Sequence, residues 1–500
     1  MSLAIIYSRA QTGMNAPLVI VETHLSHGMP KFMIVGLPKT AVKESRDRVR
    51  SALINSNFKL PTGRLTVNLA PADLPKESSR FDLPIALGVL IASKQLDINN
   101  LEQYEFVGEL ALSGKLRQIR GILPIALQTK KNNRALIIPK NNANEASLVQ
   151  GLKILPAEHI LDVCAHLNNQ TIIQPHTTLD IKQAKYYDLD LSDVRGQQHA
   201  RRALEIAAAG GHSLLLTGPP GSGKTMLAAR LPSILPIMTD QEAIEAAAVA
   251  SISHQGFKSR HWKIRPYRAP HHSASSNALV GGSNPPKPGE ISLAHQGVLF
   301  LDELPEFSRH VLEALREPLE SGTIIISRAA RQCEFPARFQ LIAAMNPCPC
   351  GHLSDPTGDC RCTIEQIQRY RNKISGPMLD RIDMHVTVPR LPLNMLSSPI
   401  NDHTESSAQV RKRVVRARQR QLNRAQKTNA QLTNKDLSKY CQLRTKEQQF
   451  FYQAANKLNL SARSYHRVLK VARTIADLAC EDQINITTLS EALSLRQPIS

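Results

Sequence analysis

The sequence contains no long apolar run, since no stretch approaches the roughly 18 continuous apolar residues that a membrane-spanning helix needs. It also begins Met1-Ser-Leu-Ala-Ile-Ile-Tyr-Ser-Arg, without a basic leader before an apolar segment, which argues against a secretory signal. These two features predict a cytoplasmic protein with no membrane partner. Aromatic residues make up only 4% of the chain, which argues against a stacking platform for single-stranded nucleic acid.

Acidic residues are outnumbered, with 42 Asp and Glu against 62 Lys and Arg and a formal net charge of +20. The imbalance is strong in residues 401–500, which hold 18 Lys and Arg but 8 Asp and Glu. A basic surface attracts polyanions, of which nucleic acid is the commonest in a cell. The charge therefore favours a nucleic-acid partner, although an ordinary protein with an alkaline pI is the alternative interpretation.

One motif has a specific chemical meaning, because the run Gly218-Pro-Pro-Gly-Ser-Gly-Lys-Thr225 fits the phosphate-binding pattern G-x-x-x-x-G-K-[ST]. It follows an apolar strand predicted over residues 213–217 and precedes a helix predicted over 226–231. Glycines let the backbone N–H groups turn toward phosphate oxygens, and the helix N-terminus favours an anion. We expect Lys224 to reach the β- and γ-phosphates of ATP and the Thr225 hydroxyl to bind Mg²⁺. The predicted nucleotide-binding residues of this loop are Gly218, Pro219, Pro220, Gly221, Ser222, Gly223, Lys224 and Thr225.

Further polar residues that suit ATP hydrolysis follow two predicted apolar strands. An apolar strand over 298–301 ends in Asp302 and Glu303, and we expect Asp302 to hold Mg²⁺ and Glu303 to polarise the attacking water. A second strand, over 340–344, leads to Asn346, which is expected to orient the same water. Both strands are predicted to lie beside the strand at 213–217 in a parallel sheet. Arg381, in Ser375-Gly-Pro-Met-Leu-Asp-Arg-Ile-Asp383, is the candidate arginine finger for a neighbouring subunit; its alternative is an ordinary Arg–Asp surface pair.

Three domains are predicted from the change in pattern along the chain. Residues 1–170 show short apolar strands, such as 65–69 and 135–138, that alternate with helical spacing, as in 82–94. Residues 171–190 are polar and aperiodic, which is typical of a linker. Residues 191–391 carry the ATP motifs, and residues 392–500 show helical patterns throughout.

Four of the eight cysteines are clustered in one short loop, as the pairs Cys348/Cys350 and Cys360/Cys362. Cytosolic cysteines are normally reduced, so disulfides are not the first interpretation. Four thiolates suit a closed tetrahedral Zn²⁺ site that staples a loop with little core of its own. The one-residue spacing within each pair is less common than two, and unliganded thiols or a redox pair are the alternatives.

Three segments are candidates for contact with DNA. Two short strands around Arg328 and Arg331 predict a hairpin that carries two cations. The stretch from Arg268 to His272, with Gly281-Gly282 after it, predicts a loop; His271 and His272 are a weaker candidate metal pair. Seven cations and no acid fall between Arg411 and Arg424, among them Lys412 and Arg413, and a solvated or interface face is the alternative there. Cationic contacts of this kind would bind backbone phosphates independently of sequence.

The order of these motifs resembles the AAA+ ATPases related to the magnesium-chelatase ATPase subunit, and nearly the whole chain resembles the YifB/ComM family within them. The runs that carry the resemblance are Pro71-Ala-Asp-Leu-Pro-Lys-Glu, Phe81-Asp-Leu-Pro-Ile-Ala, Tyr267-Arg-Ala-Pro-His-His, Gly289-Glu-Ile-Ser-Leu-Ala-His and Ala472-Arg-Thr-Ile-Ala-Asp-Leu. The resemblance implies an α/β chain with three parts: a Lon-protease-like (ribosomal S5 domain 2-like) α+β domain, an AAA+ core with pore hairpins, and a helical lid of the magnesium-chelatase C-terminal type. It also implies that Arg463 is the sensor arginine of the lid.

For function, the resemblance implies a homo-hexameric ring that acts as a DNA helicase or branch-migration motor. Such a motor would act on single-stranded or branched DNA, alongside recombination proteins, when incoming DNA is integrated by homologous recombination in natural transformation. A Lon-type protease needs a Ser–Lys dyad, but the matching positions fall near Phe81-Asp82 and Ile125; Ser78 and Ser79 lie close by. The alternatives are an AAA+ protein remodeller linked to the Lon-like domain, and the motor subunit of a metal chelatase.

Overall fold

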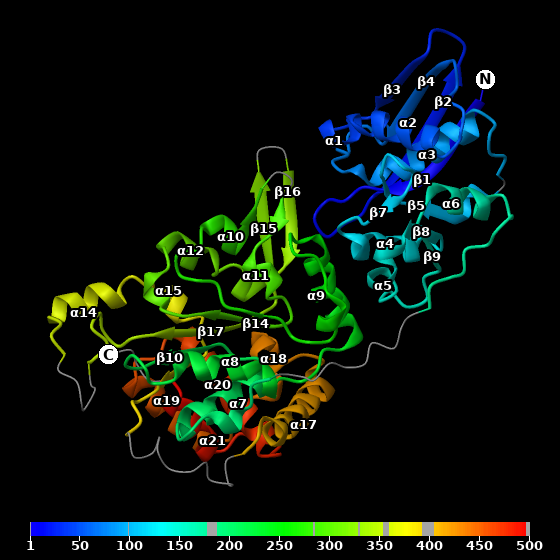
Figure 1. The fold of residues 1–500 in the computed structure, drawn as a ribbon. Coiled ribbons are helices and arrows are strands. Elements are labelled where there is room, and N and C mark those ends of the chain that lie inside the picture. The colour runs from blue at the N-terminus through cyan, green and yellow to red at the C-terminus, as the bar shows by residue number, and fades with distance from the viewer. Residues whose placement is uncertain are drawn as a thin grey trace. The chain divides into compact units, whose positions relative to one another are not determined.

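The computed structural model describes residues 2–98, 100–177, 188–283, 286–328, 331–353, 360–392 and 405–496. Their contacts form two compact units (Figure 1). The first comprises residues 1–182, 247–262 and 327–335, and the second comprises 183–246, 263–326 and 336–500. The helical lid and most of the predicted ATP-binding core thus share the second unit, but residues 247–262 and 327–335 of that core belong to the first. The predicted linker has residues 178–187 outside the described part of the chain.

The first unit begins with a four-stranded sheet in the order β1-β2-β4-β3. Its strands are β1 (Ser2–Arg9), β2 (Leu18–Ser26), β3 (Lys31–Val35) and β4 (Arg64–Ala70). In β4 every second residue is buried, which is the pattern of a strand with one face on the core. The helices α2 (Ser45–Asn55) and α3 (Asp82–Ala92) belong to this layer, and α3 is buried around most of its circumference.

A three-stranded parallel sheet, in the order β5-β8-β9, completes the first domain. Its elements are β5 (Tyr104–Phe106), α4 (Ile122–Lys131), β8 (Ala135–Pro139), α5 (Ala143–Ala146), β9 (Ile154–Ala157) and α6 (Ile160–Leu167). A small antiparallel pair, β6 (Glu109–Leu110) and β7 (Leu116–Arg117), precedes α4. The strands predicted at 65–69 and 135–138 and the helix predicted at 82–94 are therefore confirmed.

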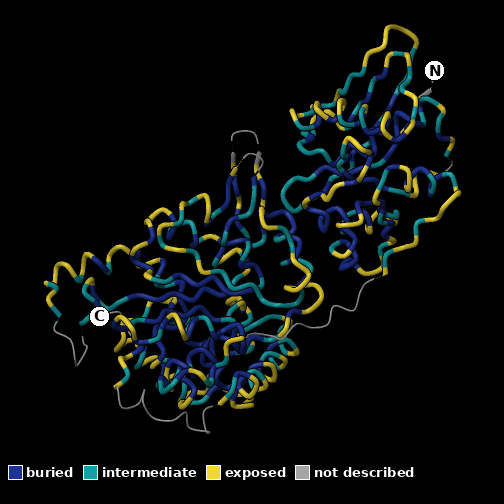
Figure 2. The backbone as a smooth tube through the Cα atoms, in the orientation of Figure 1, coloured by how far each residue is buried: buried dark blue, intermediate teal, exposed yellow. Residues whose placement is uncertain are grey.

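A five-stranded sheet, in the order β11-β14-β17-β10-β18, forms the centre of the second unit. Its strands are β10 (Leu214–Thr217), β11 (Tyr267–Arg268), β14 (Val298–Leu301), β17 (Gln340–Met345) and β18 (Met384–Thr387), and all neighbours run parallel. Figure 2 shows the middle strands buried along their length, as expected for a parallel sheet covered on both faces. The predicted parallel arrangement is confirmed, with β17 lying between the other two predicted strands.

Helices and short hairpins surround this sheet. Before β14 come α7 (Gln198–Gly210), α8 (Lys224–Ile234), α9 (Asp240–Ile252), α10 (Ser276–Val280), β12 (Gly281–Gly282), β13 (Lys287–Pro288) and α11 (Glu290–Leu293). After it come α12 (Arg309–Ala314), α13 (Pro318–Ser321), β15 (Thr323–Arg328), β16 (Arg331–Pro336), α14 (Ile364–Arg371) and α15 (Gly376–Leu379). The strands β15 and β16 pair with each other, which confirms the predicted hairpin.

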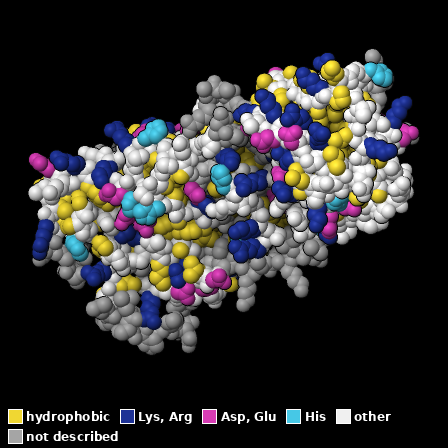
Figure 3. Space-filling view, turned by 45° about the horizontal axis from the view of Figure 1, so that its top comes forward, with side chains coloured by type: hydrophobic (Ala, Val, Ile, Leu, Met, Phe, Trp, Pro, Cys, Tyr) yellow, Lys and Arg dark blue, Asp and Glu magenta, His cyan; other side chains and the backbone are white. Residues whose placement is uncertain are grey.

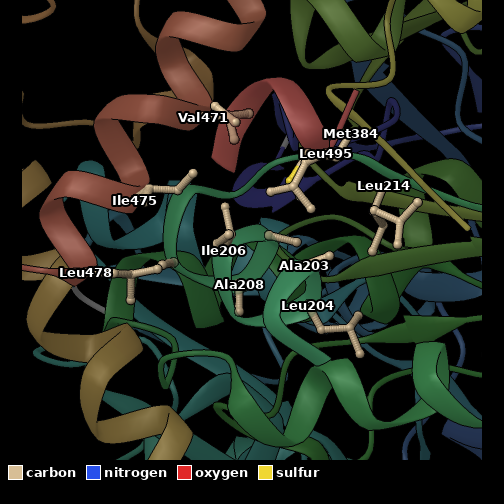
Figure 4. Packing of buried hydrophobic residues seen from close by; sticks show 14 of the residues in the cluster. Ala203, Leu204, Ile206, Ala208, Leu214, Met384, Val471, Ile475, Leu478 and Leu495 are labelled. Carbon is tan, nitrogen blue, oxygen red and sulfur yellow. The ribbon is translucent and has the colours of Figure 1, made fainter. Parts of the chain in front are cut away.

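The C-terminal part is helical over its described residues 405–496, as predicted. Its helices are α17 (Ser407–Ala425), α18 (Asn434–Tyr440), α19 (Thr445–Lys457), α20 (Ala462–Leu478) and α21 (Ile486–Ser494). Figure 4 shows Val471, Ile475 and Leu478 of α20 packed near Ile206 and Ala208 of α7, within one continuous apolar cluster. Because this cluster runs from the lid into the core, the lid does not form a separate compact unit. None of the described helices combines the length and apolar character needed to cross a bilayer.

Candidate active site

The predicted ATP-site residues meet at one edge of the parallel sheet. The P-loop follows β10, Asp302 and Glu303 follow β14, and Asn346 follows β17. The register pairs Thr217 with Met345 and Leu301 with Ala343, so these three strands end side by side. Ligands of open α/β sheets bind outside the carboxyl ends of such strands. The structure thus brings together the residues that the sequence placed far apart along the chain.

The conformation of the P-loop explains its glycines. Gly221 and Gly223 have φ angles of +73° and +91°, where an L-residue is strained, although nothing lies within 4 Å of a Cβ built at either position. Gly218 is required for a different reason, because a Cβ there would lie 2.1 Å from the Val388 carbonyl oxygen. The helix α8 begins at Lys224, inside the motif and directly after its last glycine. The loop therefore has the strand–turn–helix context that phosphate binding needs.

Lys224 lies folded over the P-loop. Its ammonium donates hydrogen bonds to the carbonyl oxygens of Gly218 at 2.7 Å and Pro219 at 2.9 Å, and to Asn346 Oδ1 at 3.2 Å. Burial lowers the pKa of Lys224, while the nearby carboxylates of Asp302 and Glu303 act in the opposite direction. A phosphate entering the loop would compete with these uncharged acceptors for the ammonium, and its negative charge favours that exchange.

Two oxygen groups suited to Mg²⁺ lie in contact. Thr225 Oγ1 donates a hydrogen bond to Asp302 Oδ2 at 2.6 Å, and Asp302 Oδ1 accepts one from the Glu303 backbone N–H at 2.9 Å. Mg²⁺ prefers hard oxygen ligands and is usually held by one or two protein groups together with substrate phosphates. The pair Thr225 and Asp302 fits that requirement beside the phosphate loop.

Glu303 has a contact that the sequence did not reveal. Its carboxylate lies 3.1 Å from His272 Nδ1, and its backbone has a φ of +52°. The ring of His272 lies against that of His271, with centroids 4.1 Å apart. The loop that was predicted from the stretch Arg268–His272 thus reaches the residue expected to polarise water. Glu303 must exchange this histidine for a water molecule in order to act as a base.

Arg381 and Arg463 are brought together by one carboxylate. Arg381 is buried and donates from Nη1 to the Pro377 carbonyl at 2.8 Å and from Nη2 to Glu320 Oε1 at 2.9 Å. Arg463 Nη2 lies 3.1 Å from the same Glu320 oxygen. The partner of Arg381 is therefore a glutamate on α13, and not one of the two Asp residues beside it in the sequence.

The aspartate that ends the Arg381 motif has a structural place. Asp383 accepts a hydrogen bond from the Ser213 backbone N–H at 3.0 Å and pairs with His212 and with Arg467 of α20. Burial alone would raise the pKa of Asp383, but Arg467 and His212 hold it well below its usual range. This network ties the edge strand of the sheet to the lid helix that carries Arg463.

The four clustered cysteines converge. The sulfur atoms of Cys348, Cys350, Cys360 and Cys362 all lie within 4.8 Å of one another. The Cys348–Cys350 sulfurs are 3.4 Å apart, too long for a disulfide but close to the edge of about 3.8 Å that Zn–S bonds of about 2.3 Å give in a tetrahedron. A backbone N–H donated by His352 lowers the pKa of Cys350 to about 6, which favours its thiolate, whereas burial and the neighbouring cysteines raise the pKa of Cys360 and Cys362. The donor set fits Zn²⁺, and it is the only such group among the described residues.

The cysteine loop also touches the P-loop. Gly351, with a φ of +84°, approaches Pro220 so closely that an added Cβ would lie 2.5 Å from the proline Cδ. Cys348 follows Asn346 by two residues, and Arg371 of α14 donates to the intervening Pro347 carbonyl at 3.2 Å. The shape of this loop therefore fixes one side of the ATP site.

The candidate DNA contacts differ in whether the structure shows partners for them within the protein. The strand β15 ends at Arg328 and β16 begins at Arg331, and the side chains of both arginines lie outside the described part of the chain. On α17, Arg413 is held by Glu205 at 2.5 Å and by Glu405, while Lys412 is exposed and Arg411 is half-buried. Two further arginines of this helix pair with carboxylates, Arg420 with Asp482 and Arg424 with Asp477, and Arg418 donates hydrogen bonds to backbone carbonyls of α7.

The cations of the protein are not gathered into one patch on the face drawn in Figure 3, where Lys and Arg side chains lie among acidic ones. The sequence left open that the cations of α17 contact acidic neighbours within the protein. Arg413, Arg420 and Arg424 make such contacts. Much of the positive charge counted at the C-terminus thus holds the lid to the core and to itself.

The first domain shows no protease dyad among its described contacts. The Ser78 hydroxyl accepts from Arg80 Nε at 2.5 Å, Ser79 bonds to Glu109, and Lys76 donates to the Pro71 carbonyl. Asp82 is buried in an ion pair with Arg48 at 2.8 Å. None of these contacts joins a serine to a lysine.

A P-loop, an acidic pair and a polar strand end, on a parallel sheet with a helical lid, define the AAA+ class of P-loop ATPases. Comparison with protein families gives the same result: the model for magnesium chelatase, subunit ChlI, matches residues 190–396, and models for subunit ChlI of Mg-chelatase and for its C-terminal part match residues 21–142 and 404–496.

Three relatives refine the placement. Competence protein ComM of Haemophilus influenzae is 57% identical over 99% of this chain and 98% of its own length. The uncharacterized protein YifB of Escherichia coli is 50% identical over 99% of this chain and 97% of its own length. The magnesium-chelatase 38 kDa subunit of Acidiphilium rubrum is 34% identical over 14% of this chain and 20% of its own length. The protein belongs to the YifB/ComM family of magnesium-chelatase-like AAA+ ATPases.

Proposed function

We propose that the protein is a ring-shaped, ATP-driven DNA motor, a helicase or branch-migration enzyme. Its task would be to promote the integration of incoming DNA by homologous recombination in natural transformation, together with recombination proteins. The observation that carries this proposal is the full-length similarity to a relative named a competence protein, joined to an assembled ATP site. A motor needs both the ATP site and a polymer to move, and DNA is the polymer that this relationship favours.

Within the site, each residue has a proposed role in hydrolysis. Lys224 binds the β- and γ-phosphates, and Asn346 orients the attacking water for which Glu303 accepts a proton. Thr225 and Asp302 hold Mg²⁺, which when bound neutralises charge on the phosphates. The cysteine loop holds a structural Zn²⁺ that keeps Pro220 and Asn346 in place.

The arginines support an oligomer. In the described part of the chain, Arg381 and Arg463 contact Glu320, and neither contacts Lys224, Thr225 or Asp302. We therefore assign Arg381 to a neighbouring subunit's γ-phosphate, where a guanidinium stabilises the charge of the transition state, with Arg463 as the sensor arginine of the lid. Hydrolysis then requires a ring, for which six subunits is the number that the family resemblance implies.

The hairpin of β15 and β16 is the proposed DNA-contacting element, with Arg328 and Arg331 on backbone phosphates. We place Arg411 and Lys412 second, because their helix uses several neighbouring cations in ion pairs within the protein. The two competing functions have less support. No Ser–Lys contact occurs among the described residues that would favour a protease-linked unfoldase, and the curated magnesium-chelatase subunit matches only 14% of the chain.

The proposal predicts that DNA stimulates ATP hydrolysis, so we expect single-stranded or branched DNA to raise kcat. Replacement of both Arg328 and Arg331 by Ala should lower DNA affinity. It should also reduce the slope of log K against log salt by about 2, since each lost phosphate contact removes about 1. The measurement is ATPase turnover and DNA binding over a salt series.

The matched control replaces two exposed lid cations, Lys435 and Lys446, by Ala, which changes the net charge equally. This control should keep the salt slope of the wild type. A turnover that DNA does not change would contradict the proposed function. An unchanged slope in the Arg328 and Arg331 variant would move the DNA contact away from the hairpin.

A further inference from the structure

Glu320 occupies a position that the hydrolysis mechanism leaves unexplained. One oxygen of its carboxylate, Oε1, lies 2.9 Å from Arg381 Nη2 and 3.1 Å from Arg463 Nη2. The Arg381 side chain is only 8% exposed, whereas those of Glu320 and Arg463 are 46% and 48% exposed. A single, half-exposed carboxylate thus binds both arginines that are proposed to act on ATP, one from the core and one from the lid.

The lid side of this contact is anchored to the core close by. Ser464, next to Arg463 at the start of α20, donates to Asp380 Oδ1 at 3.3 Å and accepts from Arg496 at 2.8 Å. Asp380 directly precedes Arg381 in the chain. The two arginines are therefore held near each other by the fold, and Glu320 is the group that joins them.

Glu320 is also tied to the base of the hairpin. It lies in α13, which ends one residue later, and β15 starts at Thr323. The Ser321 hydroxyl and the Thr323 backbone exchange hydrogen bonds of 2.9 and 3.1 Å. Gly322, with a φ of +73°, accepts from the Ala337 backbone N–H at 2.8 Å, which closes the base between the two strands. A shift of Thr323 at the base of β15 would therefore reach Glu320 through the two intervening residues, Ser321 and Gly322.

We propose that Glu320 is a positioning residue that restrains Arg381 and Arg463 and couples them to the hairpin. While Glu320 holds both guanidinium groups, one nitrogen of each is bound to its carboxylate and the arginines are less available to a nucleotide. A displacement of the hairpin moves Glu320 and frees them for the γ-phosphate. This inference rests on the proposed function, since it takes the hairpin as the DNA contact and the arginines as partners of ATP.

The chemistry makes the restraint reversible. The pair of Glu320 with Arg463 joins two half-exposed groups and is weak, because water screens it and both side chains lose freedom when they pair. A phosphate offers more charge and more acceptor oxygens than one carboxylate, so it can displace Glu320 from a guanidinium. Arg381 Nε is buried with no acceptor among the described residues. The ion pair with Glu320 therefore leaves one donor of this guanidinium unused.

The test replaces Glu320 by Gln in the full chain and measures ATP turnover with and without DNA. We expect DNA-free kcat to rise about 3- to 10-fold at an unchanged KM for ATP, as the loss of two screened ion pairs allows, and DNA then to add less than about 2-fold. Glu320→Asp keeps the charge and should keep most of the DNA response. Glu317→Gln is the matched control, because Glu317 lies three residues earlier and makes no ion pair among the described residues; it should behave as wild type.

Two outcomes would overturn the restraint. Turnover of Glu320→Gln equal to that of the wild type, with the same DNA response, would show that the carboxylate restrains nothing. A fall in kcat both with and without DNA would show that Glu320 supports the arginines in their active position. Combining Glu320→Gln with Arg381→Lys should abolish the gain. If DNA fails to stimulate the wild type, the proposed function fails, while the DNA-free comparison still decides the restraint.

Discussion

Replacing Glu303 by Gln is expected to lower kcat for ATP hydrolysis by about 100-fold or more while ATP still binds, since general-base catalysis contributes roughly 10²- to 10⁴-fold. The amide has the shape of the carboxylate but cannot accept a proton from water. Lys224, Thr225 and Asp302 keep their own contacts, so the phosphates and Mg²⁺ should be held as before. Single-turnover hydrolysis and the binding of a fluorescent ATP analogue would measure the two effects separately.

Glu306 provides the control for this experiment. It lies three residues after Glu303, on the same edge of the sheet, and pairs with Lys373 at 3.0 Å on the surface. Glu306→Gln should therefore leave kcat close to the wild-type value. If Glu303→Gln kept a kcat within about 3-fold of wild type, the assignment of Glu303 as the base would be wrong.

Loss of the metal at the cysteine loop is expected to have the second large effect. We expect about one Zn²⁺ per chain, and we expect Cys360→Ser to lose it, since a structural site uses four ligands. The variant should bind ATP about 10-fold or more weakly, because losing one hydrogen bond to a charged phosphate costs roughly 1.5 kcal/mol, which is about tenfold in Kd. The physical reason is the contact of Gly351 with Pro220 and the short link from Cys348 to Asn346. Metal analysis and ATP titration would measure both effects.

Cys480→Ser is the matched control, since this cysteine is exposed and lies outside the cluster. It should retain both the zinc content and the ATP affinity of the wild type. Purified wild-type protein in which all eight cysteines react with a thiol reagent and no zinc is found would exclude the metal site. A Cys360→Ser variant that loses zinc but binds ATP normally would show that the loop does not shape the P-loop.

The arrangement of the predicted ATP-site residues could be predicted from sequence because its parts obey local rules. A glycine loop between an apolar strand and a helix has few other interpretations, and acidic or amide residues at the ends of parallel strands must gather at one edge. The positions of Lys224, Thr225, Asp302 and Asn346 follow from that topology, and their contacts in the structure agree with it.

The contacts of His272 and Glu320 could not be predicted in the same way. His272 reaches Glu303 from the segment between β11 and β14, and Glu320 meets Arg381 and Arg463 although both lie far from it in the sequence. Such pairs depend on how loops pack, and the periodicity of apolar residues in the sequence carries no information about that packing. A histidine pair beside an ATP motif, without further metal ligands nearby, was the one available signal, and it favoured a loop role over a metal site.

For α17 the sequence suggested more cations available to a polyanion than the structure leaves. Seven cations in fourteen residues look like a surface for a polyanion. Glu205 and Asp477, which bind Arg413 and Arg424, come from helices far away in the sequence. A count of charges cannot tell a cation that awaits a ligand from one that is already paired.

The central claim, that ATP hydrolysis here moves DNA, is tested most directly by strand displacement on a labelled branched DNA junction with ATP and Mg²⁺. Wild type would be compared with Lys224→Ala, which removes the ammonium that binds the phosphates. We predict that the wild type resolves the junction into separated duplexes and that Lys224→Ala does not. A wild-type protein that hydrolyses ATP but leaves the junction intact would contradict the DNA-motor account and direct the search to a protein substrate.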